Sequence, residues 1–95
     1  MATSQTILSL DVGERRIGVA YADTSIRIPV ARGVVEVDGT EIDAIKEIYK
    51  QLEASVIVLG YPRNQSGEPT KQTRSVEGFA DRLSAAGFDY VFQDE

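Results

Sequence analysis

The sequence contains no cysteine and no histidine. Disulfides, thiolate nucleophiles, zinc sites and histidine general bases are therefore excluded. Any catalysis by this chain must rest on carboxylates, lysine, hydroxyl groups or a bound metal ion. The absence of cysteine is in keeping with a reducing compartment, and we expect a cytoplasmic protein.

Long apolar runs and a basic leader are also missing. No apolar run approaches the ~20 residues that a membrane span requires, and residues 1–6 lack the charge pattern of a signal peptide. We therefore expect no membrane association. We also expect a single domain over residues 1–95, because a chain of this length has room for only one core.

Positive charge is scarce, since 10 lysines and arginines face 15 acidic residues and the net charge is −5. That balance argues against binding nucleic acid by bulk electrostatics. The distribution is uneven, however. Residues 11–32 hold four arginines and three acids, whereas residues 33–60 hold six acids and two lysines. The acidic excess is interpreted as the solvated face of one helix, so the net charge says little about the loops near Asp11.

Hydrophobic periodicity predicts seven elements in an α/β fold. Branched apolar runs predict strands over residues 6–12, 16–23 and 29–37, with a hairpin between the first two and a possible bulge at Gly33. Apolar residues at three- and four-residue spacing predict helices over 41–54 and 71–86, the first opened by a capping box of Thr40 and Asp43. Residues 56–60 and 88–93 complete a five-stranded mixed sheet. Right-handed crossovers would make strands one, four and five parallel and put both helices on one face.

Two carboxylates follow strands at the carboxyl edge of this sheet. Asp11 ends the first strand, and Glu95 follows the last. An Asx-type turn also explains an Asp at such a position, but two neighbouring carboxylates would repel unless a divalent cation lay between them. Mg²⁺ or Mn²⁺ suits this site, because hard cations take oxygen ligands from one or two carboxylates and from phosphate groups. We therefore expect Asp11 and Glu95 to be metal ligands, and the long polar loop of residues 61–69 to be functional.

Four blocks of the sequence, in order, resemble the YqgF/RuvX family. They extend from about residue 7 to residue 95, and although one block alone would be weak evidence, the four together are specific. The blocks are LDVG at 10–13 with RIGVA at 16–20, VLGYP at 58–62, TRSV at 73–76 with FADRL at 79–83, and QDE at 93–95.

The resemblance implies a ribonuclease H-like fold and metal-dependent hydrolysis of phosphodiester bonds in structured nucleic acid. The substrate would be the 5′ end of the precursor of 16S ribosomal RNA or a Holliday junction, and Asp11 and Glu95 would be catalytic. Arginines near this edge are candidates for phosphate contacts, although each is also explained as a solvated surface residue. The candidate nucleic-acid contacts are Arg15, Arg16, Arg63, Asn64 and Arg74.

Two departures from the family pattern affect this interpretation. Glu14 stands where the family usually has a small hydroxyl residue, which adds negative charge near the expected metal ions. The family also continues with a further helical segment that carries a third acid. We therefore expect a domain cut off after the second acid, with one sheet face uncovered and a homodimer or other self-association through that face. Two alternatives remain: an inactive binding or assembly unit, and nucleotide binding as in actin-like ATPases, which also place Asp-x-Gly at a strand end.

Overall fold

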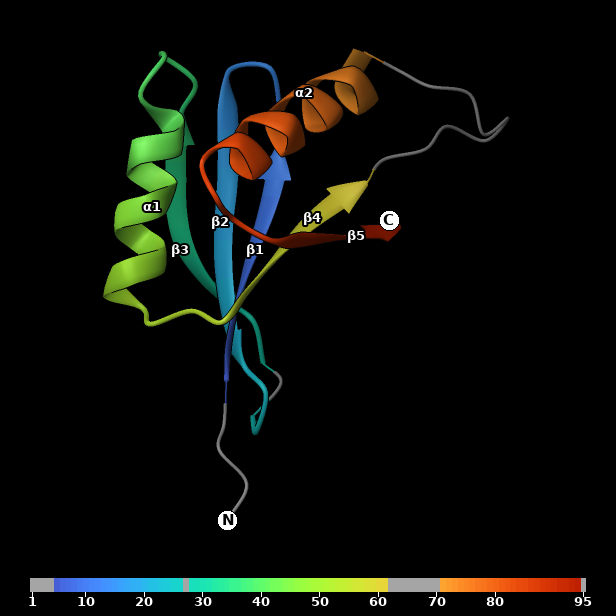
Figure 1. The fold of residues 1–95 in the computed structure, drawn as a ribbon. Helices are drawn as coiled ribbons and strands as arrows, with labels where there is room; N and C mark the ends of the chain where they lie inside the picture. The colour runs from blue at the N-terminus through green and yellow to red at the C-terminus, as the bar shows by residue number, and fades with distance from the viewer. Residues whose placement is uncertain (1–4, 27, 62–70, 95) are drawn as a thin grey trace.

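The computed structural model describes residues 5–26, 28–61 and 71–94, and Figure 1 shows their arrangement. The chain forms five strands and two helices in this part. Their bounds are β1 (Thr6–Val12), β2 (Arg16–Asp23), β3 (Val30–Glu36), α1 (Glu41–Gln51), β4 (Val56–Tyr61), α2 (Lys71–Ala85) and β5 (Tyr90–Asp94).

The five strands form one mixed sheet in the order β3-β2-β1-β4-β5. β1 lies at its centre, antiparallel to β2 and parallel to β4, and β4 is in turn parallel to β5. This arrangement confirms the hairpin of β1 and β2 and the shared direction of β1, β4 and β5 that the sequence predicts. The expectation that Asp11 and Glu95 follow neighbouring strands is wrong, because β4 lies between β1 and β5. Because β1, β4 and β5 run the same way, their carboxyl ends share one edge of the sheet.

Both helices cover the same face of the sheet. α1 packs near β3, and α2 packs over β1, β4 and β5 (Figure 1). Along β1 and β4, most residues that point toward the helices are buried and most of those between them are not, as the period of two in a strand requires. The buried core comprises Leu8, Leu10, Val12, Ile17, Val19, Val35, Ile45, Ile57, Leu59, Val76, Phe79 and Leu83.

The opposite face is covered by no described element, as predicted. Its residues are mostly small or β-branched, and they come from all five strands. Val34 and Val91 are 60% and 52% exposed there. The other apolar residues of this face, which alternate with the buried ones, are Ile7, Ala20, Ala22, Val56 and Val58.

Two local features, the bulge in β3 and the end of α1, each coincide with a residue of positive φ. The register between β2 and β3 shifts between Val19 and Ala20, opposite Gly33. Gly33 has φ +131°, a conformation that favours glycine, so the predicted bulge is confirmed. α1 ends at Gln51 rather than at residue 54, because Glu53 adopts φ +52° and breaks the helical path.

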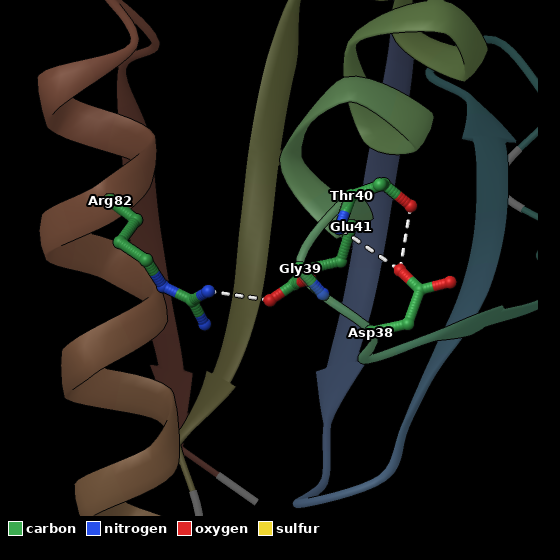
Figure 2. A network of polar contacts seen from close by, with 5 residues as sticks. All are labelled: Asp38, Gly39, Thr40, Glu41 and Arg82. Carbon is green, nitrogen blue, oxygen red and sulfur yellow. Dashed lines mark hydrogen bonds and ion pairs between the residues drawn. The ribbon is translucent and has the colours of Figure 1, made fainter.

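The predicted capping box at the start of α1 is wrong. Thr40 occupies the N-cap position, but its side chain makes no capping hydrogen bond. Its hydroxyl instead donates to Asp38 Oδ1 at 2.6 Å (Figure 2). The side chain of Glu41 binds the turn before the helix, because its Oε1 accepts a 2.7 Å hydrogen bond from the backbone N–H of Gly39.

Glu41 also joins the two helices. Its side chain is only 2% exposed, and Oε2 accepts a hydrogen bond from Nη1 of Arg82 in α2 (Figure 2). The sequence suggested that the acidic residues of α1 form a solvated face. This interpretation is wrong for Glu41, which is buried between the helices. Glu41 lies four residues before the buried Ile45. Residues at this spacing share one face of a helix, so Glu41 points inward like Ile45.

None of the helices in the described part of the chain is long and apolar enough to cross a membrane.

We predict that Glu41→Gln lowers the free energy of unfolding by about 1–3 kcal/mol at pH 7, because hydrogen bonds to a buried charged group are lost. A hydrogen bond from its own backbone N–H, with those from Arg82 and Gly39, holds the pKa of Glu41 below its usual value against the opposing effect of burial. This contribution is fully present above about pH 4.3, the unfolded pKa, and is lost as pH falls through the folded pKa. Urea unfolding from pH 3 to 7 measures it.

The exposed acid Glu47 on the same helix provides the control, since Glu47→Gln should change stability by less than about 0.5 kcal/mol. A Glu41→Gln protein as stable as the wild type at pH 7, or a difference that persists undiminished to pH 3, would contradict this role for Glu41.

Self-association through the uncovered face remains a prediction. A bare apolar face of several hundred Å² is more than soluble monomers usually expose. Sedimentation at micromolar concentration should therefore show a dimer, and Val91→Lys, which puts a charge on this face, should shift it to monomer. Ile26→Lys is the matched control, because Ile26 is 65% exposed in a turn outside the sheet. A wild-type monomer that binds no hydrophobic dye would show the prediction to be wrong.

Candidate active site

Asp11 lies at the carboxyl end of the central strand and points to the uncovered face. Its neighbours Leu10 and Val12 are each 2% exposed on the helix side, so the pleat turns Asp11 the other way. Asp11 is exposed there. A carboxylate in this position is open to a ligand that approaches the sheet from the side without helices.

Glycines stand on both sides of Asp11 in the sheet. Gly18 pairs with Asp11 across β2, and a Cβ added there would lie 3.6 Å from the Asp11 Cβ. The parallel register Leu10 to Leu59, continued by one residue, puts Gly60 on the other side, and Gly60 pairs with Gln93 of β5. The neighbours of Asp11 therefore add no side chains beside its carboxylate, and an exposed amide lies two strands away.

Of the two metal ligands expected from the sequence, only Asp11 lies in the described part of the chain. No group of three or more acids gathers to hold a metal ion within residues 5–26, 28–61 and 71–94. Glu95, the expected second ligand, lies outside the described residues. A single exposed carboxylate on an open face is compatible with Mg²⁺ or Mn²⁺, because such ions keep several waters and use one or two protein carboxylates.

The hairpin between β1 and β2 forms the end of the sheet beside Asp11. Gly13 donates from its N–H to the Arg16 carbonyl at 2.9 Å, and a Cβ on Gly13 would come equally close to that oxygen. Only glycine fits this turn without a shift of the backbone. Glu14 at the tip lies 3.3 Å from Lys71 Nζ, so its charge is paired with α2 and not with a group on the Asp11 face.

The predicted arginines gather at this end of the molecule but not on one surface. Arg15 is exposed at the hairpin tip. Arg16 alternates with Ile17 and so shares the face of Asp11, where its Nε lies 3.9 Å from Glu36 Oε1. Arg74 lies on the helix side, in the first half of α2. The remaining candidates, Arg63 and Asn64, lie outside the described residues.

The sequence did not predict a hollow that the structure shows on the helix-covered face of the sheet. It has a volume of about 240 Å³ and lies between the hairpin tip and α2. Val12, Gly13 and Glu14 line it from the hairpin. Its α2 wall is formed by Arg74, Ser75, Gly78 and Arg82. The signal for it in the sequence was the spacing of Arg74 and Arg82, eight residues or about two helical turns apart on α2. Only the packing of α2 on the hairpin shows that they face a recess.

The sequence of this chain matches a known protein family. The family model described as "RuvX: Holliday junction resolvase" matches residues 5–95. A protein of Chloroflexus aurantiacus named "Putative pre-16S rRNA nuclease" is 40% identical over 84 residues, which are 86% of this chain and 55% of that protein. A protein of the same name from Caldanaerobacter subterraneus subsp. tengcongensis is 34% identical over 94 residues, 94% of this chain and 66% of that protein. The chain thus spans little more than half the length of several relatives.

Solved structures with low sequence identity share the fold. The RuvC protein of T. thermophilus, solved in complex with a Holliday junction substrate, matches with a TM-score of 0.61 at 12% identity, over 96% of this chain and 66% of that one. A member of the Ppx/GppA family from Aquifex aeolicus matches with a TM-score of 0.53 at 10% identity, over 97% of this chain and 36% of that one. The fold is ribonuclease H-like, and the chain belongs to the RuvX family.

Proposed function

We propose that this domain contributes to metal-dependent hydrolysis of phosphodiester bonds in structured nucleic acid, with Asp11 as a catalytic metal ligand. The observation that carries the proposal is the position of Asp11: an exposed carboxylate at the end of the central strand, with glycines on both sides and no described element above it. This arrangement leaves room for an ion and for a phosphate group of the substrate. Mg²⁺ or Mn²⁺ at this point would polarise the phosphoryl oxygens and lower the pKa of a bound water.

The residues around Asp11 would supply binding and orientation. Arg16 shares its face and could neutralise a phosphate oxygen through its fork of N–H donors, while its contact with Glu36 at 3.9 Å between exposed side chains is weak. Glu95 is proposed as the second catalytic and metal ligand from its place in the sequence. Arg15, Arg63, Asn64 and Arg74 are retained as proposed contacts to the nucleic acid.

The precursor of 16S ribosomal RNA is the substrate that we favour. Relatives at 33–40% identity carry that substrate in their names, whereas the likeness to RuvC at 12% identity speaks only for the fold. A Holliday junction remains the second candidate, because it appears in the description of the matching family. The alternative of nucleotide binding, as in actin-like ATPases, is supported only by the Asp-x-Gly motif and the fold, and we do not favour it. Because the chain spans little more than half the length of several relatives, the proposal for this domain is limited to the metal site and its contacts with the nucleic acid.

Calorimetric titration with Mn²⁺ tests the role of Asp11. We expect the wild-type chain to bind Mn²⁺ and Asp11→Asn to lose most of that binding, because a neutral amide is a far weaker ligand for a hard cation than a carboxylate. Asp43→Asn is the matched control, since Asp43 is exposed on α1, and α1 covers the face of the sheet opposite to Asp11. Equal binding by wild type and Asp11→Asn would contradict the proposal.

A cleavage assay on both substrates completes this test. It compares RNA spanning the 5′ boundary of 16S ribosomal RNA with a four-way DNA junction, in Mg²⁺ and in Mn²⁺. Cleavage of the RNA that Asp11→Asn abolishes would support the favoured substrate. Cleavage of the junction alone would overturn that choice.

A further inference from the structure

We propose that the hollow between the hairpin tip and α2 is a binding site for a backbone phosphate of nucleic acid, with Arg74 and Arg82 as its ligands. The site is separate from Asp11, which lies on the other face of the sheet. This inference rests on the proposed function for the identity of the ligand, but the site itself is tested independently below.

Arg82 is held in place before any ligand arrives. Its guanidinium donates to the buried Glu41 carboxylate from one side (Figure 2). Its Cζ also lies 5.6 Å from the centre of the Phe79 ring on its own helix. One Nη1–H is used in the bond to Glu41, and an arginine has five N–H donors. The side chain is 51% exposed, so the remaining donors are accessible. A fixed guanidinium loses little conformational entropy when it binds an anion.

Arg74 supplies a charge that no described residue pairs with. It stands two turns before Arg82 on α2, lines the same hollow, and forms no hydrogen bond or ion pair with any residue of the described part of the chain. The nearby Glu14 faces the hollow too, but Lys71 pairs with it at 3.3 Å. Around the hollow, Lys71, Arg74 and Arg82 outnumber Glu14 and Glu41, so the recess favours an anion.

The shape of the hollow favours a phosphate group over a nucleobase. Ile17 and Phe79 contribute to its floor, but both are 0% exposed and offer no surface on which a base could stack. Arg74, Ser75 and Arg82 are the residues of the α2 wall whose polar groups can reach a ligand in the recess. A volume of about 240 Å³ admits a phosphate group with some water. Arginine is well suited to this ligand, because its planar fork matches the phosphate oxygens.

The two sites are linked through consecutive residues of β1. Asp11 points to the uncovered face and Val12 points into the hollow, and their Cα atoms are only about 3.8 Å apart. The exposed Arg15 lies at the hairpin tip between the two sides. A nucleic-acid strand that passes over this tip could therefore place one phosphate near Asp11 and another in the hollow.

Gly78 allows the hollow to be closed without removing a charge. It forms part of the wall, and a Cβ added to it would meet nothing within 4 Å. Gly78→Leu therefore fills the recess while improving helix propensity, and its thermal midpoint should equal or exceed that of the wild type. Ser84→Leu is the matched control, since Ser84 is exposed on α2 and does not line the hollow.

The test is an NMR titration with inorganic phosphate at constant ionic strength, with chloride as the reference anion. We expect saturable shifts at the amides of Gly13, Ser75 and Gly78. Gly78→Leu and Arg74→Gln should each weaken phosphate binding about tenfold or more, as expected for loss of a charge-assisted contact, and Ser84→Leu should not. No saturable shift in the wild type, or equal binding by Gly78→Leu, would overturn the proposal.

A second measurement identifies the source of the phosphate. Binding of a single-stranded oligonucleotide is followed as salt is raised, and Gly78→Leu should reduce the slope of log K against log salt by about 0.7, the value for one lost contact. An unchanged slope would overturn the assignment to nucleic acid. Asp11→Asn separates this proposal from the preceding one, because it should abolish Mn²⁺ binding while the phosphate shifts remain. Failure of the metal site alone would reject the proposed function and leave the phosphate site intact.

Discussion

The alternation of side chains along β1 is the constraint on which the rest of the structure depends. Leu8, Leu10 and Val12 fill the core beneath the helices, and this fixes Asp11 on the opposite face. A register slip of one residue would bury the carboxylate under α2 and expose the leucines, at a prohibitive cost in free energy. The same residues that stabilise the fold thus determine where the candidate metal ligand can lie.

The hairpin tip connects the two sides of the sheet and ties them to α2. Lys71 contacts Glu14, and the side-chain amide of Gln72 donates to the Val12 carbonyl at 3.3 Å. The start of α2 is therefore attached to the carboxyl end of β1. Farther along the same helix, Arg82 is attached to α1 through Glu41. These polar contacts set the position of α2 over the hydrophobic core, and with it the position of Arg74 and Arg82 around the hollow.

Most of the fold follows from the sequence because its patterns are local and consistent. The apolar runs at β1 and β4 gave the correct strands, and the short hairpin and the helical crossovers gave the correct strand directions. The capping box failed because Thr40 and Asp38 bind each other, a competition among three residues that spacing alone does not resolve. The inward position of Glu41 depends on Arg82, 41 residues away, and such a partner is visible only after folding.

The candidate site was predictable in part for the same reason. A strand pattern locates Asp11 at the carboxyl edge and the glycine at position 18 beside it. It does not separate Arg16, on the Asp11 face, from Arg74, on the helix side, because that division depends on how α2 packs across the sheet. The hollow was missed because its walls come from the hairpin and a helix about 60 residues later.

The central claim is that a divalent ion binds on the uncovered face of the sheet beside Asp11. Paramagnetic broadening of backbone amide signals by substoichiometric Mn²⁺ tests it most directly. The account predicts broadening centred on Asp11, Gly18 and Gly60, extending to Gln93, with the amides of α1 unaffected. Broadening centred on the acids of α1, or spread evenly over the acidic surface, would contradict it.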